Sequence, residues 1–290
     1  MKKNINKKVI SSGLFVCLLL SVFSFASAID CSGEECSGTI SLTLGNSAPT
    51  VPHVGSVSEV ILTGGTTKTI YVVFNASDSN GYLDLDHGTA SVTLFKSGET
   101  NRTSSVCVAQ ENTTKQTVFN CSIEMEFYDS AGADWGIDAT VDDDAAETAK
   151  NDTEVFTVAS LDFVTQDVSV ITWASVITGT NDNEADNSII ITNGGNNDYT
   201  VLNLTGYDAT YSGNVINAEN FSVDGLTGQS ADQTYMVNDT AVDATANADL
   251  VGLTTHGAAV TEEIFFYVDA PDALPVGEYV QDSSWVIKIA

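Results

Sequence analysis

The chain has 290 residues, of which 43% are hydrophobic, and its 39 acidic and 10 basic side chains give a formal net charge of −29. The apolar fraction is large enough to form a packed core, which distinguishes the chain from a disordered acidic tail. Because the negative field repels phosphate groups and anionic lipid surfaces, we predict that the protein does not bind nucleic acid.

Residues 1–28 have the pattern of a cleaved signal peptide. Four lysines precede the apolar run from Leu14 to Phe25, which ends in Ala26-Ser27-Ala28. A basic head, a short apolar run and small residues at the cleavage point are the marks of an export signal. We therefore expect a secreted, extracellular, cell-surface associated protein that begins near Ile29. Its remaining apolar runs are too short for a transmembrane anchor, which needs roughly 18 residues.

Residues 29–47 are predicted to form an N-terminal arm that contains one strand, Thr39 to Leu44. Its apolar residues Ile40, Leu42 and Leu44 alternate with Ser41 and Thr43, but no neighbouring segment offers a hairpin partner. Two interpretations stay open. The strand either adds to a sheet edge of a second copy, which would make a homo-oligomer by strand addition, or it packs on its own first domain.

Residues 48–159 are predicted to form a first β-domain, because apolar and polar residues alternate with the period of a strand. The clearest alternation runs from Trp135 to Val141. Turn signals such as Asn80-Gly81 separate the strands, and a closing strand is expected at Glu154 to Val158. The other alternating sets are Ile70-Val72-Phe74 and Val92-Leu94.

Cys17 belongs to the signal peptide, so the exported chain keeps an even number of cysteines, as is typical of an oxidising compartment. Cys107 and Cys121 flank a polar turn centred on Thr113-Thr114, and a hairpin would place them opposite each other. Cys31 and Cys36 are expected to close a small loop. The spacing of these four cysteines lacks the paired C-x₂-C pattern of zinc sites.

Residues 160–290 are predicted to form a second β-sandwich domain, with the boundary near Val158 to Phe163 and a strand-rich block from Val168 onward. Its last strands are expected at Ile264 to Val268 and at Trp285 to Ile289. Both are apolar on nearly both faces, which indicates central positions in a sheet.

Three segments of the first domain carry a resemblance to a known group of modules. They run from Phe74 to Asp86, from Phe127 to Ile137, and over Val141-Asp142. Together they resemble the PKD and related Ig-like β-sandwich repeats of secreted prokaryotic cell-surface proteins. The Trp-Asp-Phe-Gly-Asp core of PKD repeats is absent.

In the second domain, residues 189–196 and 274–279 are similar to sandwich domains of secreted archaeal and bacterial envelope proteins. The resemblance implies a structural or adhesive role. The expected fold is therefore all-β, with two tandem Ig-like antiparallel β-sandwich domains after the signal peptide.

Oxygen-bearing side chains crowd the loop around Gly81 and the end of the strand that contains Trp135. Calcium requires six to eight oxygen ligands, and this crowding predicts a Ca²⁺ site, the only cofactor expected. The alternative is an ordinary solvated loop. The candidate ligands are Asp78, Asn80, Asp84, Asp86, Asp142 and Asp144.

Asn-x-Ser/Thr sequons are potential glycan acceptors in an exported chain. We expect glycosylation at Asn75, Asn101, Asn112, Asn151, Asn203, Asn220 and Asn238, whereas Asn120 lies beside a predicted disulfide and is crowded.

The sequence shows no arrangement typical of an enzyme, since His53, His87 and His256 lie in unrelated contexts. We therefore predict a non-catalytic structural or adhesive protein, S-layer-like or filament-like, whose partners are envelope proteins or further copies of itself. The alternative is an extracellular carbohydrate-binding module that binds glycans through loops or aromatic side chains. A hydrolase with scattered carboxylates is a third hypothesis.

Overall fold

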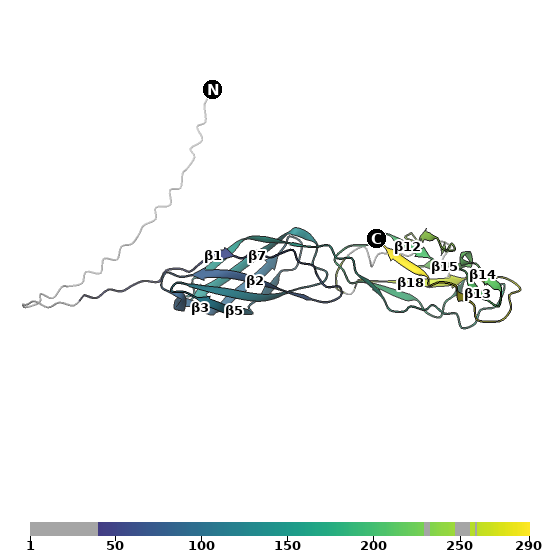
Figure 1. Cartoon of the computed structure of the whole chain (residues 1–290), viewed down its shortest axis with the longest axis horizontal. Coiled ribbons are helices and arrows are strands. Elements are labelled where there is room, and N and C mark those ends of the chain that lie inside the picture. The colour runs from purple at the N-terminus through teal and green to yellow at the C-terminus, as the bar shows by residue number, and fades with distance from the viewer. Residues whose placement is uncertain (1–39, 229–232, 247–255, 259) are drawn as a thin grey trace, which may run out of the picture. The chain divides into compact units, whose positions relative to one another are not determined.

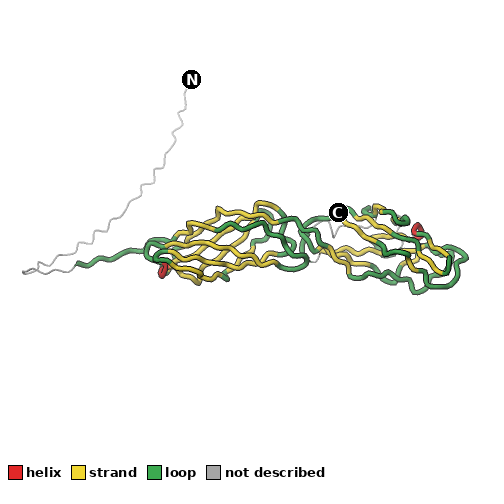
Figure 2. Tube along the Cα trace, in the orientation of Figure 1, coloured by secondary structure: helices red, strands yellow, loops and turns green. Residues whose placement is uncertain are grey.

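The structure is a computed structural model that describes residues 40–228, 233–246, 256–258 and 260–290 (Figure 1). The regular elements are β-strands in antiparallel sheets, together with two short 3-10 helices, η1 (Tyr82–Asp84) and η2 (Ala218–Asn220). Figure 2 shows that the described chain consists of strands and loops, with two short helical segments. The all-β prediction is therefore confirmed. The predicted signal peptide and the predicted Cys31–Cys36 loop lie outside the described residues.

Two four-stranded sheets bury their inner faces in one hydrophobic cluster, here called the first core. The first sheet has the order β1 (Thr50–Val54), β2 (Lys68–Ser77), β6 (Gln116–Met125), β5 (Cys107–Asn112). The second sheet has the order β4 (Arg102–Ser104), β3 (Leu85–Phe95), β7 (Gly132–Asp143), β8 (Thr148–Val158).

Strand β7 shows how the sequence pattern becomes packing. Trp135, Ile137 and Val141 are fully buried, while Asp138 and Thr140 between them lie on the outer face. Because successive side chains of a strand point to opposite faces, the alternation puts every second residue into the core. The Trp135 ring also satisfies its polar nitrogen, since Nε1 donates a hydrogen bond to the Ser130 carbonyl oxygen at 2.9 Å.

The hairpin of β5 and β6 carries the disulfide that the cysteine spacing predicted. Cys107 and Cys121 lie directly opposite each other in the register and are bonded, and the turn between the strands contains Thr113 and Thr114. A covalent bond across neighbouring strands restricts the unfolded chain and so stabilises the folded one.

A second cluster of buried residues, here called the second core, begins at Val168, whereas the last residue packed on the first core is Leu161. Its largest sheet has the order β16 (Thr234–Tyr235), β15 (Phe221–Asp224), β18 (Val260–Val268), β11 (Ile189–Asn193), β9 (Val164–Gln166), and β10 (Asn183–Glu184) pairs with β18. Two further sheets have the orders β17 (Ala241–Asp243), β12 (Leu202–Thr205), β20 (Val286–Ile289) and β14 (Asn214–Ile216), β13 (Ala209–Tyr211), β19 (Val280–Gln281).

Three strand predictions differ from the structure or hold only in part. Strand β18 lies inside its sheet as predicted, but β20 lies at an edge, because it pairs with β12 alone. Its exposed Val286 and Lys288 also leave one face outside the core. The block expected from Val168 onward contains no strand over residues 167–182. Residues 40–44 also form no strand in the structure.

A buried ion pair connects strand β4 to the turn that follows β6. Asp129 is fully buried, and the Arg102 guanidinium donates hydrogen bonds to both of its carboxylate oxygens, with Nε 3.1 and 3.2 Å from them. The backbone N–H of Glu126 also donates to Asp129 Oδ2, at 2.8 Å. A carboxylate in the interior is tolerated when it is paired and hydrogen-bonded in this way.

We expect Arg102→Ala to lower the free energy of unfolding by about 3–5 kcal/mol, because it leaves the Asp129 carboxylate buried without its partner. Urea denaturation at neutral pH measures the change. Lys150→Ala is the matched control, since the Lys150 side chain is 53% exposed in its pair with Asp138 and exposed pairs contribute about 0–1 kcal/mol. Equal losses in the two variants would contradict this account of Asp129.

Candidate metal centre

Three carboxylates meet at one end of the first core. Asp78 follows β2, Asp84 ends η1 and Asp143 ends β7, and one oxygen atom of each lies within 4.8 Å of the others. Strands β2 and β7 belong to different sheets. The three carboxylates, here called the aspartate cluster, therefore join segments of both layers.

The turn after β2 brings Asp78 and Asp84 together. Asp78 Oδ1 accepts a hydrogen bond from the backbone N–H of Asn80 at 2.6 Å, which is the usual way an aspartate starts a turn. Gly81 then adopts a φ of 120°, a value that other residues rarely take, and η1 follows at once. The Asp84 carbonyl oxygen accepts from the backbone N–H of Asp144 at 2.8 Å, which fixes η1 against the end of β7.

Asp143 is almost fully buried and is held ionised by hydrogen-bond donors. Its Oδ2 accepts from the Asn46 side-chain amide at 2.8 Å, and its Oδ1 accepts from the backbone N–H groups of Ala145 and Glu147, both at 2.9 Å. The Asn46 bond is the main cause that lowers the pKa of Asp143, because donors stabilise the charged form.

Asp78 and Asp84 have fewer hydrogen-bond donors around their carboxylates. Asp78 is 1% exposed, and within the described part of the chain Oδ2 of Asp78 and Oδ2 of Asp84 are buried and accept no hydrogen bond. Burial, followed by repulsion from Asp78, Asp143 and Asp144, raises the pKa of Asp84. Buried polar atoms normally have a partner, so these two oxygens leave the cluster short of positive charge.

The cluster has the chemistry of a site for a hard divalent cation. Carboxylate oxygens are the preferred ligands of Ca²⁺, which also accepts backbone carbonyls and water to complete six to eight ligands. Asp78, Asp84 and Asp143 would hold the ion. A cation there would supply the charge that the two oxygens lack and would relieve the repulsion that raises the pKa of Asp84.

The structure gathers two of the six predicted ligands, Asp78 and Asp84, and adds Asp143, which lies between the predicted ligands Asp142 and Asp144. Asp143 falls two residues after the buried Val141, so the alternation of β7 points it inward, and this signal was present in the sequence.

The other four predicted ligands lie outside the group of three. Asp144 is exposed. The remaining three accept hydrogen bonds elsewhere: Asn80 from the Ser47 N–H at 2.9 Å, Asp86 from the Gly88 N–H at 2.9 Å, and Asp142 from the Thr148 hydroxyl at 2.6 Å.

The sequons fall into two groups by exposure. The side chains of Asn101, Asn112 and Asn238 are exposed, whereas Asn75, Asn151, Asn203 and Asn220 are half-buried. The Asn151 amide donates to the Val51 carbonyl oxygen at 2.9 Å. A glycan on Asn151 would have to replace this hydrogen bond. The three exposed asparagines are therefore more accessible to glycosylation than the four half-buried ones.

The histidines lie in separate surroundings. His87 Nε2 is 3.2 Å from the Thr117 hydroxyl, and His256 Nδ1 is 2.9 Å from a carboxylate oxygen of Asp198. His53 lies in β1.

Comparison with known proteins assigns no family: no protein-family model matches the chain, and no curated protein matches it significantly. Among the described residues, the structure contains no helix with the length and apolar character that crossing a bilayer requires.

We expect Asp84→Asn and Asp143→Asn to shift the melting temperature of the metal-free protein in opposite directions. The raised pKa of Asp84 means that its stabilising contribution is present below the unfolded value of 3.8 and is lost as pH rises through the folded pKa. At pH 7 the amide therefore raises the melting temperature. The pKa of Asp143 is lowered, so the effect of this carboxylate on stability is opposite. Its stabilising contribution is present above the unfolded value of 3.8 and is lost as pH falls through the folded pKa. At pH 7, Asp143→Asn therefore lowers the melting temperature.

Thermal denaturation at pH 7 in a chelator measures both shifts. Shifts of the same sign would contradict the opposed electrostatic roles of the two carboxylates.

Proposed function

We propose that the protein is a secreted, non-catalytic structural or adhesive component of the cell surface. In this proposal two tandem Ig-like β-sandwich domains are built around the two cores, and the first domain binds Ca²⁺ at the aspartate cluster. The observation that carries the proposal is the placement of Asp78, Asp84 and Asp143, which brings three carboxylates from both sheets together with two buried oxygens that lack donors.

Calcium at this position would act as a cross-link. It would tie the loop after β2 and helix η1 to the end of β7, next to the point where Asn46 bonds Asp143. A site of this kind stiffens the end of a module instead of performing a reaction. Extracellular modules bind Ca²⁺ with dissociation constants of about 10⁻⁴–10⁻³ M, which suits the calcium levels outside cells.

Export and surface location are supported by independent features. The disulfide Cys107–Cys121 is the kind of bond that persists in oxidising compartments, and the export signal predicted over residues 1–28 would deliver the chain there. The exposed sequons are accessible to glycosylation in the same compartment. The large negative charge keeps such a protein soluble and favours cations at its surface. The expected partners are other envelope proteins and further copies of the chain.

A carbohydrate-binding module is the second candidate, and one observation favours it. The aromatic side chains Trp173, Tyr279 and Trp285 all line one cavity beside the second core. A glycan array with the exported chain tests this candidate, and a selective ligand lost on substitution of Tyr279 would support it.

We expect calcium to stabilise the wild-type protein and to have little effect on Asp84→Asn. At a calcium concentration 100 times the dissociation constant, binding adds about 2.7 kcal/mol to the free energy of unfolding. Asp86→Asn is the matched control, because it removes the same charge from the same segment but lies outside the cluster. Isothermal titration and thermal denaturation with and without calcium measure the effect. An equal calcium response in Asp84→Asn and wild type would exclude this site.

We expect a tagged full-length chain to be processed near Ala28 and to be found at the cell surface. Cell fractionation combined with mass spectrometry of the mature N-terminus measures both. Retention of the unprocessed chain in the cytosol would refute the proposed location, whatever the calcium result.

A further inference from the structure

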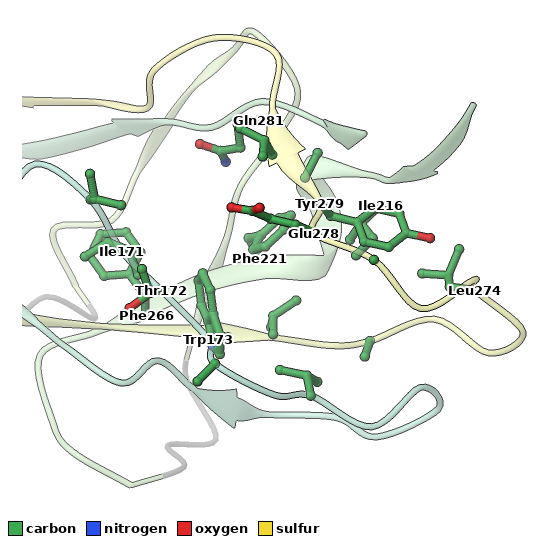
Figure 3. Close-up of a pocket in the computed structure, with 18 of the residues that line it drawn as sticks. Ile171, Thr172, Trp173, Ile216, Phe221, Phe266, Leu274, Glu278, Tyr279 and Gln281 are labelled. Atoms are coloured by element: carbon green, nitrogen blue, oxygen red, sulfur yellow. The ribbon is translucent and has the colours of Figure 1, made fainter. Parts of the chain in front are cut away.

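A cavity of about 610 Å³ lies beside the second core (Figure 3). Figure 3 shows Trp173, Phe221 and Tyr279 around it, each from a different segment. Glu278 is the one charged side chain among the described residues that line it. Its lining is mixed, with apolar and aromatic side chains beside serine and threonine residues. Packed interiors keep few voids larger than a water molecule, so a cavity of this size has room for an occupant with one apolar and one polar face.

One wall of the cavity is residues 169–176, which run beside the second core without belonging to a sheet. One side of this segment is hydrogen-bonded to residues 186 and 187. The Thr172 carbonyl oxygen accepts from the Asp186 N–H at 2.8 Å, the Thr172 N–H donates to Asn187 Oδ1 at 3.0 Å, and the Val170 carbonyl oxygen accepts from the Asn187 amide at 2.8 Å.

The other side of the segment is unpaired. The chain bends at Ser169 and Ala174. Between these bends, where alternate residues of an extended chain turn their N–H and C=O groups to the same side, the groups of Ile171 and Trp173 face away from the bonded side. Their backbone N–H and C=O groups form no hydrogen bond with any residue that the structure describes. The wall therefore presents an unpaired, strand-like edge.

The opposite wall also offers an edge. Strand β19 pairs with β13 on one side and is the last strand of its sheet, and its Val280 and Gln281 line the cavity. Trp285, which precedes the edge strand β20, lines it too. Two unpaired edges that line one cavity form the arrangement that accepts an added strand, because backbone groups can pair with it and the cavity can take its side chains.

The chain itself contains a segment with matching chemistry. Ile40, Leu42 and Leu44 are 97%, 78% and 80% exposed, and they alternate with the small polar residues Ser41 and Thr43. Such a segment can insert one apolar face while its other face stays polar. In addition, the sequence between Glu35 and Glu59 contains no Asp, Glu, Lys or Arg. In a chain of net charge −29, an uncharged segment and a nearly uncharged cavity allow two copies to meet without strong repulsion.

We infer that residues 40–44 of one copy insert as a β-strand into this cavity of a second copy, between residues 169–176 and β19. The inference rests on the proposed structural function and names the partner, a second copy of this chain. Donor and acceptor are different surfaces, so each copy can donate to one neighbour and accept from another. A contact of this kind does not close on itself in a dimer and extends into a chain or a ring of copies.

Light scattering of the exported chain over a range of concentrations tests the inference. We expect the mass of the wild type to increase stepwise and Leu42→Asp to weaken association at least tenfold, because an ionised carboxylate would replace an apolar side chain in a cavity whose one charged residue, Glu278, is also acidic. Thr43→Asp is the matched control: it adds the same charge to the polar face of the same segment, and assembly should persist. Both positions are exposed, so the fold tolerates both changes.

A mixing experiment makes the test directional. Val280→Asp changes the acceptor at a residue that is 58% exposed, and circular dichroism checks that the variant is folded. Each variant alone should stay monomeric. A mixture of Leu42→Asp and Val280→Asp should form dimers and stop there, since the pair retains one intact donor and one intact acceptor.

Strand insertion would be overturned by a wild type that stays monomeric or by a Leu42→Asp variant that assembles like the wild type. It would also be overturned if Thr43→Asp weakened association as much as Leu42→Asp does, or if the mixture formed no dimer. Selective binding of a glycan to Leu42→Asp that is lost in Val280→Asp would assign the cavity to carbohydrate instead. None of these outcomes alters the calcium and localisation tests, so failure of strand insertion can be distinguished from failure of the proposed function.

Discussion

The alternation of side chains along antiparallel strands is the constraint on which the rest of the first core depends. In strand β7, the alternation that buries Trp135, Ile137 and Val141 also turns Asp143 inward at the end of the strand. A carboxylate at that position cannot face water without breaking the period of the strand. The aspartate cluster is thus a direct consequence of the way the two sheets pack.

The first core accommodates its buried carboxylates in different ways, and the contrast explains why one place suits a cation. Asp129 has the Arg102 guanidinium, and Asp143 has an amide and two backbone N–H groups. Asp78 and Asp84 each keep a buried oxygen without a donor. Since an uncompensated charge in the interior is costly, these two oxygens mark the position at which an external positive charge stabilises the fold most.

Apart from β18, the strands of the second core have five residues or fewer, and some of the segments around this core belong to no sheet. Residues 169–176 are held on one side alone, and β19 has a neighbour on one side alone. A strand edge without a partner exposes backbone groups that can pair with another chain. The exposed apolar face of Ile40, Leu42 and Leu44 is the complementary feature, and the proposed exchange of a strand between copies would satisfy both.

Local patterns in the sequence determined the strand class, the inward face of β7, the hairpin that joins Cys107 to Cys121, and the acidic loop around Gly81. Period-two alternation and turn residues act over a few positions, so they can be read directly. Tertiary structure alone decided that Asp143 faces Asp78 and Asp84, that β20 lies at an edge, and that residues 167–182 remain outside the sheets. Those outcomes depend on which distant strands pair, and a carboxylate or a sheet edge acquires its neighbours only when segments far apart in the chain meet.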